Sequence, residues 1–364
     1  MDKKLLDLYS DYLISSFSQT TATGLSRLLD GTLTHDAITN FLSETDFTSQ
    51  DLWMLVKKDV RAIESEDGVL IFDDTIQEKP STDENEIVCY HWDHTKGRNV
   101  KGINLLNCLY HNRDVSLPLG FDVIHKSESY VDPKDQKTKR RSTITKNELM
   151  RAQLRQVQQN QIAYRYVLTD IWFAANENMT FIKLELKKDF IMAFKSNRMV
   201  ALSKEAKLQG RFVSIESLQM QENQVLQVYV KGLNFPVLLT QQVFTNKDGS
   251  EGILYLVCSD LDLSGDRIRA IYQKRWKVEE FHKSIKSNTG LAKSPTRVVR
   301  TQTNHFFASI YAFVKLERLR ISQQMNHFAL KSRLYLNAIK AAFLELNRMQ
   351  PDGIPSIAKT VHVT

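Results

Sequence analysis

Two short apolar runs of this sequence end in aspartate. Gly68 to Asp74 reads GVLIFDD, and Tyr164 to Asp170 reads YRYVLTD. Short continuous apolar runs of this kind are typical of buried strands. The two runs therefore predict strands that deliver a carboxylate at their C-terminal ends, where open α/β sheets place their ligands. Taken singly, each aspartate is more commonly a helix or turn cap, so the case for a site rests on the acidic positions together.

A third apolar pattern, from Ile271 to Gly290, follows the spacing of a helix. Its apolar stripe, which would pack on a core, consists of Ile271, Val278, Phe281 and Ile285. Beside that stripe, at roughly 100° per helical residue, an arc of about 60° carries polar groups. They are Tyr272, Arg275, Glu279 and Lys286. A carboxylate among cationic and phenolic groups suits a metal ligand whose neighbours hold phosphate, although a solvated charged face is the alternative.

The remaining pattern alternates between helical and strand-rich regions. Residues 1 to 65 read as helices, and Thr23 to Ser43 is compatible with a helix-turn-helix in which His35 and Thr39 would face a DNA groove. Packing is the alternative role of such a helix pair. Further along, the pattern predicts an antiparallel meander at Glu86–Tyr90, Gly102–Tyr110 and Ser116–Phe121, a helix at Thr145–Ala163, and closing helices at Thr301–Arg320 and Leu330–Met349. This order of elements argues for an α/β fold.

Between Phe181 and Ser259 the pattern changes to short β-rich runs separated by polar turns. We interpret this stretch as an inserted β subdomain.

The charge of the chain is modest overall but locally concentrated. The 364 residues carry a formal net charge of +7, and the isoelectric point is near 9.1. The densest basic run is Lys134 to Arg141 (KDQKTKRR), and Lys146, Arg151 and Arg155 extend it along the following helix. A basic patch is the electrostatic footprint of a nucleic-acid partner, although isolated runs are commonly solvated loops.

The spacing of the cysteines argues against a cysteine-ligated metal site, and the length of the apolar runs argues against a membrane-spanning protein. Cys89, Cys108 and Cys258 are far apart and lack metal-type spacing, so we expect them in the core. No apolar run reaches the roughly 18 residues of a membrane span. We therefore expect a cytoplasmic protein with access to the nucleoid, and no membrane partner.

The three acidic positions could converge on one site. Asp74, Asp170 and Glu279 offer oxygen ligands without a His or Cys cluster, which favours Mg²⁺ or Mn²⁺ over zinc. We expect His282 and His305 to be packing or DNA-contact residues.

Together these features resemble the bacterial insertion-sequence transposases with a DDE triad, in the subgroup marked by a Y-R-E-K signature. The resemblance is carried by Asp74-Thr75, by Asp170 after a strand, and by the helix with Y-x2-R-x3-E-x6-K, and it spans about Val69 to Arg320. It implies a ribonuclease-H-like (retroviral-integrase-like) core in which Asp74, Asp170 and Glu279 bind metal. The pattern alone does not choose between Asp73 and Asp74; the family's Asp-Thr pair selects Asp74 and leaves Asp73 a supporting role.

The resemblance also implies DNA contacts and a domain plan. Tyr272, Arg275 and Lys286 match positions that hold the transposon end, and we add Lys139, Arg140 and Arg141 of the basic run as DNA-binding residues. The expected regions are a helical DNA-binding part (1–65), the catalytic core (66–175 and 261–325), the β-rich insertion (176–260) and a C-terminal helical part (326–364). Relatives that form hairpin ends stack a flipped base on a tryptophan late in the insertion, but here Trp172 and Trp276 have none between them.

The expected function is cleavage of transposon ends and their joining to target DNA. Two Mg²⁺ or Mn²⁺ ions about 3.5 to 4 Å apart would activate the nucleophile and stabilise the leaving oxygen. The partners would be double-stranded DNA, namely terminal inverted repeats and target, and a second copy of the chain in the DNA complex. The alternatives are a domesticated sequence-specific DNA-binding protein and a simple metal-dependent nuclease.

Overall fold

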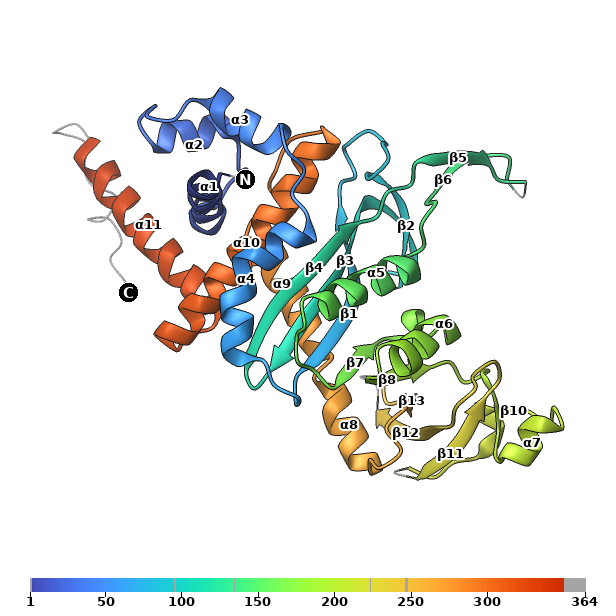
Figure 1. The fold of residues 1–364 in the computed structure, drawn as a ribbon. Coiled ribbons are helices and arrows are strands. Elements are labelled where there is room, and N and C mark those ends of the chain that lie inside the picture. The colour runs from blue at the N-terminus through green and yellow to red at the C-terminus, as the bar shows by residue number, and fades with distance from the viewer. Residues whose placement is uncertain (1, 95, 134, 223, 246–247, 350–364) are drawn as a thin grey trace, which may run out of the picture.

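A computed structural model describes residues 2–94, 96–133, 135–222, 224–245 and 248–349. Lys134 of the basic run and residues 350–364 of the expected C-terminal region therefore lie outside the described residues. Figure 1 shows helices gathered at one end of the molecule and a long sheet running through the rest.

Residues 2–65 form four helices, in agreement with the helical pattern of this stretch. They are α1 (Lys3–Ser15), α2 (Ala22–Leu28), α3 (His35–Ser43) and α4 (Ser49–Ile63). Each begins at a side chain that accepts backbone N–H groups of the first turn, namely Asp2, Thr21, Thr34 and Thr48. Helix α3 buries Ile38 and Leu42 and leaves His35 and Thr39 exposed. Because α1 and α3 pack on α10, and α4 packs on β4, this region is built onto the body of the protein.

The first half of the sheet is the predicted meander followed by a parallel strand. Its elements are β1 (Val69–Glu78), β2 (Cys89–Asp93), β3 (Arg98–Asn112), β4 (Val115–Val123), α5 (Lys146–Gln159) and β7 (Tyr166–Thr169). Strand β3 pairs antiparallel with β1, β2 and β4, whereas β1 and β7 are parallel. The basic run lies on a separate hairpin of β5 (Glu128–Val131) and β6 (Thr138–Arg141) that projects from the sheet (Figure 1).

The β-rich stretch continues the same sheet. It contains β8 (Asp189–Phe194), β9 (Met199–Ala201), α7 (Lys204–Leu208), β10 (Val213–Ser214), β11 (Val225–Val230), β12 (Val237–Thr245) and β13 (Glu251–Cys258). Strand β8 is parallel to β7, and β13 pairs with β8. The strand order among the described residues is β10-β9-β11-β12-β13-β8-β7-β1-β3-β2, with β4 also on β3. The stretch that we interpret as an inserted β subdomain therefore extends the central sheet through main-chain hydrogen bonds.

The remaining helices lie around the sheet, but the last of them is largely exposed beyond Leu330, so the expectation that residues 330–349 close the core is wrong. These helices are α6 (Asn176–Thr180), α8 (Gly265–Gln273), α9 (Trp276–Asn288), α10 (Val299–Gln323) and α11 (His327–Met349). Helix α9 packs on β1, and α10 packs on β4. Cys89, Cys108 and Cys258 are buried and free, as expected. Among the described helices, none is both long and apolar enough to cross a membrane.

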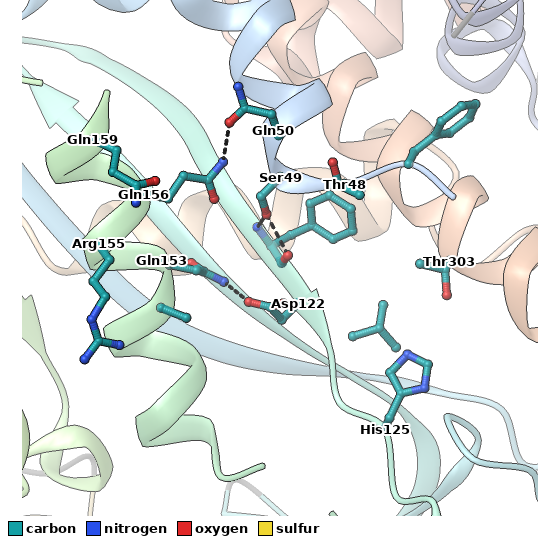
Figure 2. Close-up of a pocket in the computed structure, with 14 residues that line it drawn as sticks. Thr48, Ser49, Gln50, Asp122, His125, Gln153, Arg155, Gln156, Gln159 and Thr303 are labelled. Carbon is teal, nitrogen blue, oxygen red and sulfur yellow. Dashed lines mark hydrogen bonds between the residues drawn. The ribbon is translucent and has the colours of Figure 1, made fainter. Parts of the chain in front are cut away.

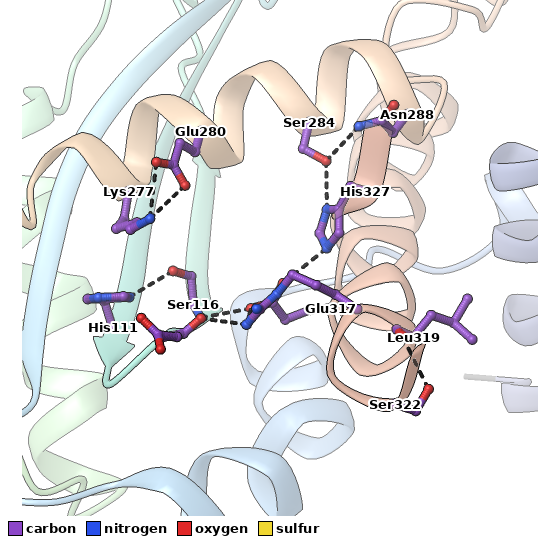
Figure 3. Close-up of polar contacts among 12 residues, drawn as sticks. His111, Ser116, Lys277, Glu280, Ser284, Asn288, Glu317, Leu319, Ser322 and His327 are labelled. Carbon is purple, nitrogen blue, oxygen red and sulfur yellow. Dashed lines mark hydrogen bonds and ion pairs between the residues drawn. The ribbon is translucent and has the colours of Figure 1, made fainter. Parts of the chain in front are cut away.

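A buried polar network attaches the start of α11 to the core (Figure 3). Ser284 of α9 lies 2.9 Å from His327 Nδ1, and His327 Nε2 lies 3.0 Å from a carboxylate oxygen of Glu317 on α10. Glu317 also accepts from Arg320 and from the backbone N–H of Ser116. Beyond Leu330, α11 is largely exposed.

Candidate active site

Strand β1 presents its two aspartates to opposite faces of the sheet, because successive side chains of a strand alternate. Asp74 faces α5, where Lys146 Nζ lies 2.7 Å from one carboxylate oxygen. The side-chain amide of Asn104 donates to the other oxygen at 2.7 Å. Asp74 is thus neutralised by a cation and an amide.

Asp73 faces α9 and lies among other acids. Its side chain is 13% exposed, and Arg275 Nη1 lies 3.3 Å from its carboxylate. Burial, together with the negative charges of Asp170 and Glu279, raises the pKa of Asp73 well above its usual range despite Arg275. Asp73 therefore sits where a further positive charge would be favourable.

Asp170 lies beside β1, directly after the end of β7. In the parallel pairing of β1 and β7, Phe72 is opposite Thr169, so Asp73 and Asp170 both follow that pair directly. The Asp170 carboxylate accepts from the backbone N–H of Trp172 at 3.0 Å and caps the short 3-10 turn Ile171–Phe173. Burial and the charge of Asp74 raise the pKa of Asp170.

Helix α9 supplies Glu279 and His282, three residues apart and hence on one face. Glu279 is 46% exposed and lies 3.4 Å from Arg275 Nη1. His282 is buried, and burial lowers its pKa to about 3, so the imidazole is neutral at physiological pH. Ligand atoms of Asp73, Glu279 and His282 all lie within 4.8 Å of one another. A neutral imidazole and two carboxylate groups are a donor set that can hold a divalent ion.

The four signature residues do not lie on one uninterrupted helix. Tyr272 belongs to α8, and the chain tightens at Lys274 and Arg275, where Arg275 N–H donates to the carbonyl of Tyr272 at 2.9 Å. Tyr272 is buried, and its hydroxyl donates to the carbonyl of Thr169 at 3.2 Å. The expectation of one continuous helix with four residues on one face is therefore wrong at this point. Tyr272 instead braces the strand end that carries Asp170.

Arg275 and Lys286 are also engaged within the protein. The Arg275 side chain is 12% exposed and contacts Asp73 and Glu279. Lys286 Nζ donates to the carbonyl of Ile76 on β1 at 2.9 Å. Burial lowers the pKa of Lys286. These two cations join α9 to β1 and face the carboxylate cluster.

The basic hairpin lies apart from the carboxylates, and two of its four described cations form ion pairs. Lys139 forms ion pairs with Asp132 and Asp135, and Arg141 lies 2.8 Å from Glu128. Arg140 has no ion pair among the described residues. The structure thus leaves Arg140 as the cation of β6 best able to meet an external phosphate.

Sequence analysis gave Asp73 a supporting role and His282 a packing or DNA-contact role, and it did not name Asn107 as a neighbour of this site. The side-chain oxygen of Asn107 lies 3.2 Å from His282 Nε2, and its amide nitrogen has no partner among the described residues. The spacing Glu279-x2-His282 was the available signal, since it places both side chains on one helix face. Which strand lies beneath that face depends on tertiary packing.

A polar cavity of about 630 Å³ lies elsewhere, between α4, β4 and α5 (Figure 2). It is lined by Asp122 and several glutamines, and none of the acidic cluster reaches it. Gln153 donates to Asp122 at 2.5 Å, while its own side-chain oxygen has no partner among the described residues. The carboxylate cluster, with more charge and more convergent ligands, is the stronger candidate for chemistry.

Comparison with known proteins gives two family matches. A family model described as DDE superfamily endonuclease matches residues 2–211, and one described as transposase DDE domain matches residues 133–314. The curated proteins contain no match. Among solved structures, the Drosophila P element transposase strand transfer complex matches with 10% identity over 96% of this chain and 86% of the other, at a TM-score of 0.27. A likeness this weak carries no argument about fold or function.

Proposed function

The chain belongs to the DDE superfamily of endonucleases and transposases, and on this premise we propose that it cuts the ends of a mobile DNA element and joins them to target DNA. One observation carries the proposal. Asp73 and Asp170 follow paired positions of two parallel strands, and α9 brings Glu279 to Asp73. Three elements distant in sequence thus meet at one acidic cluster.

The proposed fold of the catalytic part is ribonuclease-H-like. The antiparallel meander of β1, β3 and β4, followed by α5 and the parallel strand β7, supports this assignment. In the same proposal the catalytic core is residues 66–175 and 261–325, residues 1–65 bind DNA, and the strands of residues 176–260 extend the sheet away from the site.

For the acidic residues, we propose Asp170 and Glu279 together with one aspartate of β1. Asp74 stays the prediction from sequence, but the geometry favours Asp73. Asp73 contributes to the ligand cluster with Glu279, whereas Asp74 is bound to Lys146 and Asn104. Asp74 would then set the charge behind the site through Lys146.

The donor set suits a divalent cation, and membership of the superfamily implies use of one. We propose Mg²⁺ or Mn²⁺, two ions in the active complex, held by the three carboxylates. Bound there, the ions would supply Lewis-acid activation of water or a 3′-hydroxyl and stabilise the leaving oxygen. Arg275 orients Asp73 and Glu279, His282 stays neutral beside them, and Tyr272 fixes the strand end that carries Asp170.

The finer assignment is to the bacterial insertion-sequence subgroup with the Y-R-E-K signature, acting on terminal inverted repeats. Its support is the order Tyr272, Arg275, Glu279 and Lys286 after two strand-borne aspartates. Synapsis of two ends would require a dimer on DNA. Such an enzyme would work in the cytoplasm at the nucleoid.

The test is reaction of the purified protein with DNA that carries the inverted repeats flanking its own coding sequence. We expect cleavage at the repeat ends and joining of the freed 3′ ends to a plasmid, both dependent on Mg²⁺ or Mn²⁺. The matched control is the same DNA with scrambled repeats. Cleavage of both DNAs without joining would identify a simple nuclease, and binding without cleavage would identify a DNA-binding descendant.

A further inference from the structure

Three of the four tryptophans of this chain lie half in solvent. Trp53 is 4% exposed and belongs to the core, whereas Trp92, Trp172 and Trp276 are 53%, 49% and 60% exposed. Burying an aromatic side chain is worth roughly 2 kcal/mol or more, so large exposed rings that lie together mark contact surfaces.

Two of these tryptophans form a row of rings with His94. Trp92 lies at the end of edge strand β2, and its ring centroid is 6.4 Å from that of His94 in the following turn. The His94 ring is 5.6 Å from Trp172, which belongs to the turn after β7. The aromatic row, defined as Trp92, His94 and Trp172, therefore bridges two segments distant in sequence. All three side chains are exposed.

The aromatic row begins at the carboxylates. The backbone N–H of Trp172 donates to Asp170, so Trp172 belongs to the short turn that this acid caps. Lys146 Nζ lies 5.2 Å from the centre of the Trp172 ring and 2.7 Å from Asp74. Lys146 therefore lies between the row and Asp74, as the ion-pair partner of that acid.

We propose that the aromatic row stacks unpaired bases of the DNA strand whose phosphodiester lies at the carboxylate cluster. This proposal rests on the proposed function, since it takes that cluster as the place of cleavage. Bases inside a duplex already have their faces covered by neighbouring pairs, so side-on rings contact base faces only where the strand is unpaired. Aromatic side chains bind such bases with little sequence preference, because every base has a π face.

The test measures binding without metal, so it does not depend on cleavage. The probes are a ten-residue oligothymidylate and an abasic strand of the same length, which has the same phosphates without bases. We expect the wild-type protein to bind oligothymidylate about tenfold more tightly than the abasic strand, on the order of one stacked base. Trp172→Ala should remove most of this ratio and leave affinity for the abasic strand unchanged, while Trp172→Phe should retain it.

Two further variants complete the experiment. Trp92 lies outside the turn that begins at Asp170, so Trp92→Ala should also reduce the ratio and can replace Trp172→Ala if that variant proves unstable. Phe343→Ala removes an aromatic side chain of α11 that is 62% exposed and should leave the ratio unchanged. The proposal would be overturned if the ratio is unchanged in both Trp92→Ala and Trp172→Ala. It would also be overturned if these variants lose affinity for oligothymidylate and for the abasic strand equally. Separately, a wild-type protein that fails to cut DNA with Mg²⁺ yet shows base-dependent binding would contradict the proposed function alone.

Discussion

Adjacent residues of β1 experience opposite electrostatic surroundings. Asp74 is bound by Lys146 and Asn104, whereas Asp73 faces Asp170 and Glu279 with only Arg275 in partial compensation. Buried like charges destabilise a fold until a cation joins them. Asp73 thus has the surroundings of a metal ligand, and Asp74 those of an ion-paired residue.

The first prediction compares these neighbours by substitution. Asp73→Asn removes a repelling charge, so we expect the midpoint of thermal unfolding without metal to rise by roughly 1 to 3 °C. Mg²⁺ should no longer stabilise this variant, and DNA cleavage should be lost. Asp74→Asn should instead lower the midpoint and retain part of the cleavage. Full activity of Asp73→Asn with an inactive Asp74→Asn would restore Asp74 as the ligand.

A second prediction concerns Asp122 in the polar cavity of Figure 2. Burial raises the pKa of Asp122 to about 6, although Gln153 donates to it. Because the pKa of Asp122 is higher in the folded than in the unfolded protein, the protonated carboxyl stabilises the fold at pH values below the unfolded pKa. This stabilisation is lost as the pH rises through about 6.

Asp122→Asn should therefore stabilise the protein at pH 8 by roughly 1 to 3 kcal/mol and change little at pH 4. The new amide can also donate to the side-chain oxygen of Gln153, which has no partner among the described residues. Thermal unfolding at the two pH values measures the effect. Equal stabilisation at both would show that the charge of Asp122 is irrelevant.

At the scale of elements, the junction of α9 with β1 determines what the signature cations can do. Arg275 is 12% exposed and paired with two acids, and Lys286 donates to the Ile76 carbonyl. Both side chains are already engaged in holding α9 against β1.

The third prediction separates bracing from DNA contact. Arg275→Ala should lower the melting temperature and leave the slope of log affinity against log salt unchanged, because it removes no phosphate contact. Arg140→Ala on the hairpin serves as the contrast and should reduce the slope by about one unit. Binding at several salt concentrations measures both slopes. A reduced slope for Arg275→Ala would assign it to DNA.

The fourth prediction concerns how α11 is attached (Figure 3). Burial alone would raise the pKa of Glu317, but hydrogen bonds from His327, Arg320 and the Ser116 backbone outweigh it and lower that pKa. Because the pKa of Glu317 is lower in the folded than in the unfolded protein, its carboxylate stabilises the fold at pH values above the unfolded pKa of about 4.3. This stabilisation is lost as the pH falls through the pKa of Glu317 in the folded protein.

Glu317→Gln should cost roughly 2 to 4 kcal/mol near pH 7, because it leaves Arg320 and His327 without their buried partner, and the loss should shrink below pH 4. Glu345→Gln, on an exposed ion pair of α11, should cost less than about 1 kcal/mol. The free energy of unfolding of both variants, measured near pH 7 and below pH 4, compares the two losses. Similar small losses would show that the network does not attach α11.

For the whole molecule, sequence reasoning identified elements better than their partners. The apolar runs ending at Asp74 and Asp170 correctly indicated strands, because burial on both faces leaves a local signature. Strand β1 continues past Asp74 to Glu78, however, so the prediction that Asp74 lies at the C-terminal end of its strand is wrong. The β-rich stretch also contained strands, yet its joining to β7 through β8 depends on hydrogen bonds between residues distant in sequence. The local alternation of apolar and polar residues does not show which strands pair with each other.

For the candidate site, too, the sequence identified single residues better than it identified their neighbours in space. Glu279 could be selected from its helix, but the choice between Asp73 and Asp74 required knowing that α9 covers one face of β1 and α5 the other. Tyr272 was expected on one polar helix face with Arg275, Glu279 and Lys286, but it is buried on α8, because the chain tightens at Lys274 and Arg275. Helix periodicity cannot anticipate such a break.

The most direct measurement is Mg²⁺-dependent cleavage of end DNA by Glu279→Gln beside Glu280→Gln. Glu280 is the next residue of α9, is exposed and pairs only with Lys277 among the described residues, so it controls for loss of an acid from the same helix. We expect Glu279→Gln to bind DNA normally and to lose cleavage by at least about a thousandfold, while Glu280→Gln cuts at the wild-type rate. Wild-type cleavage by Glu279→Gln would contradict the assignment of the acidic cluster as the catalytic centre.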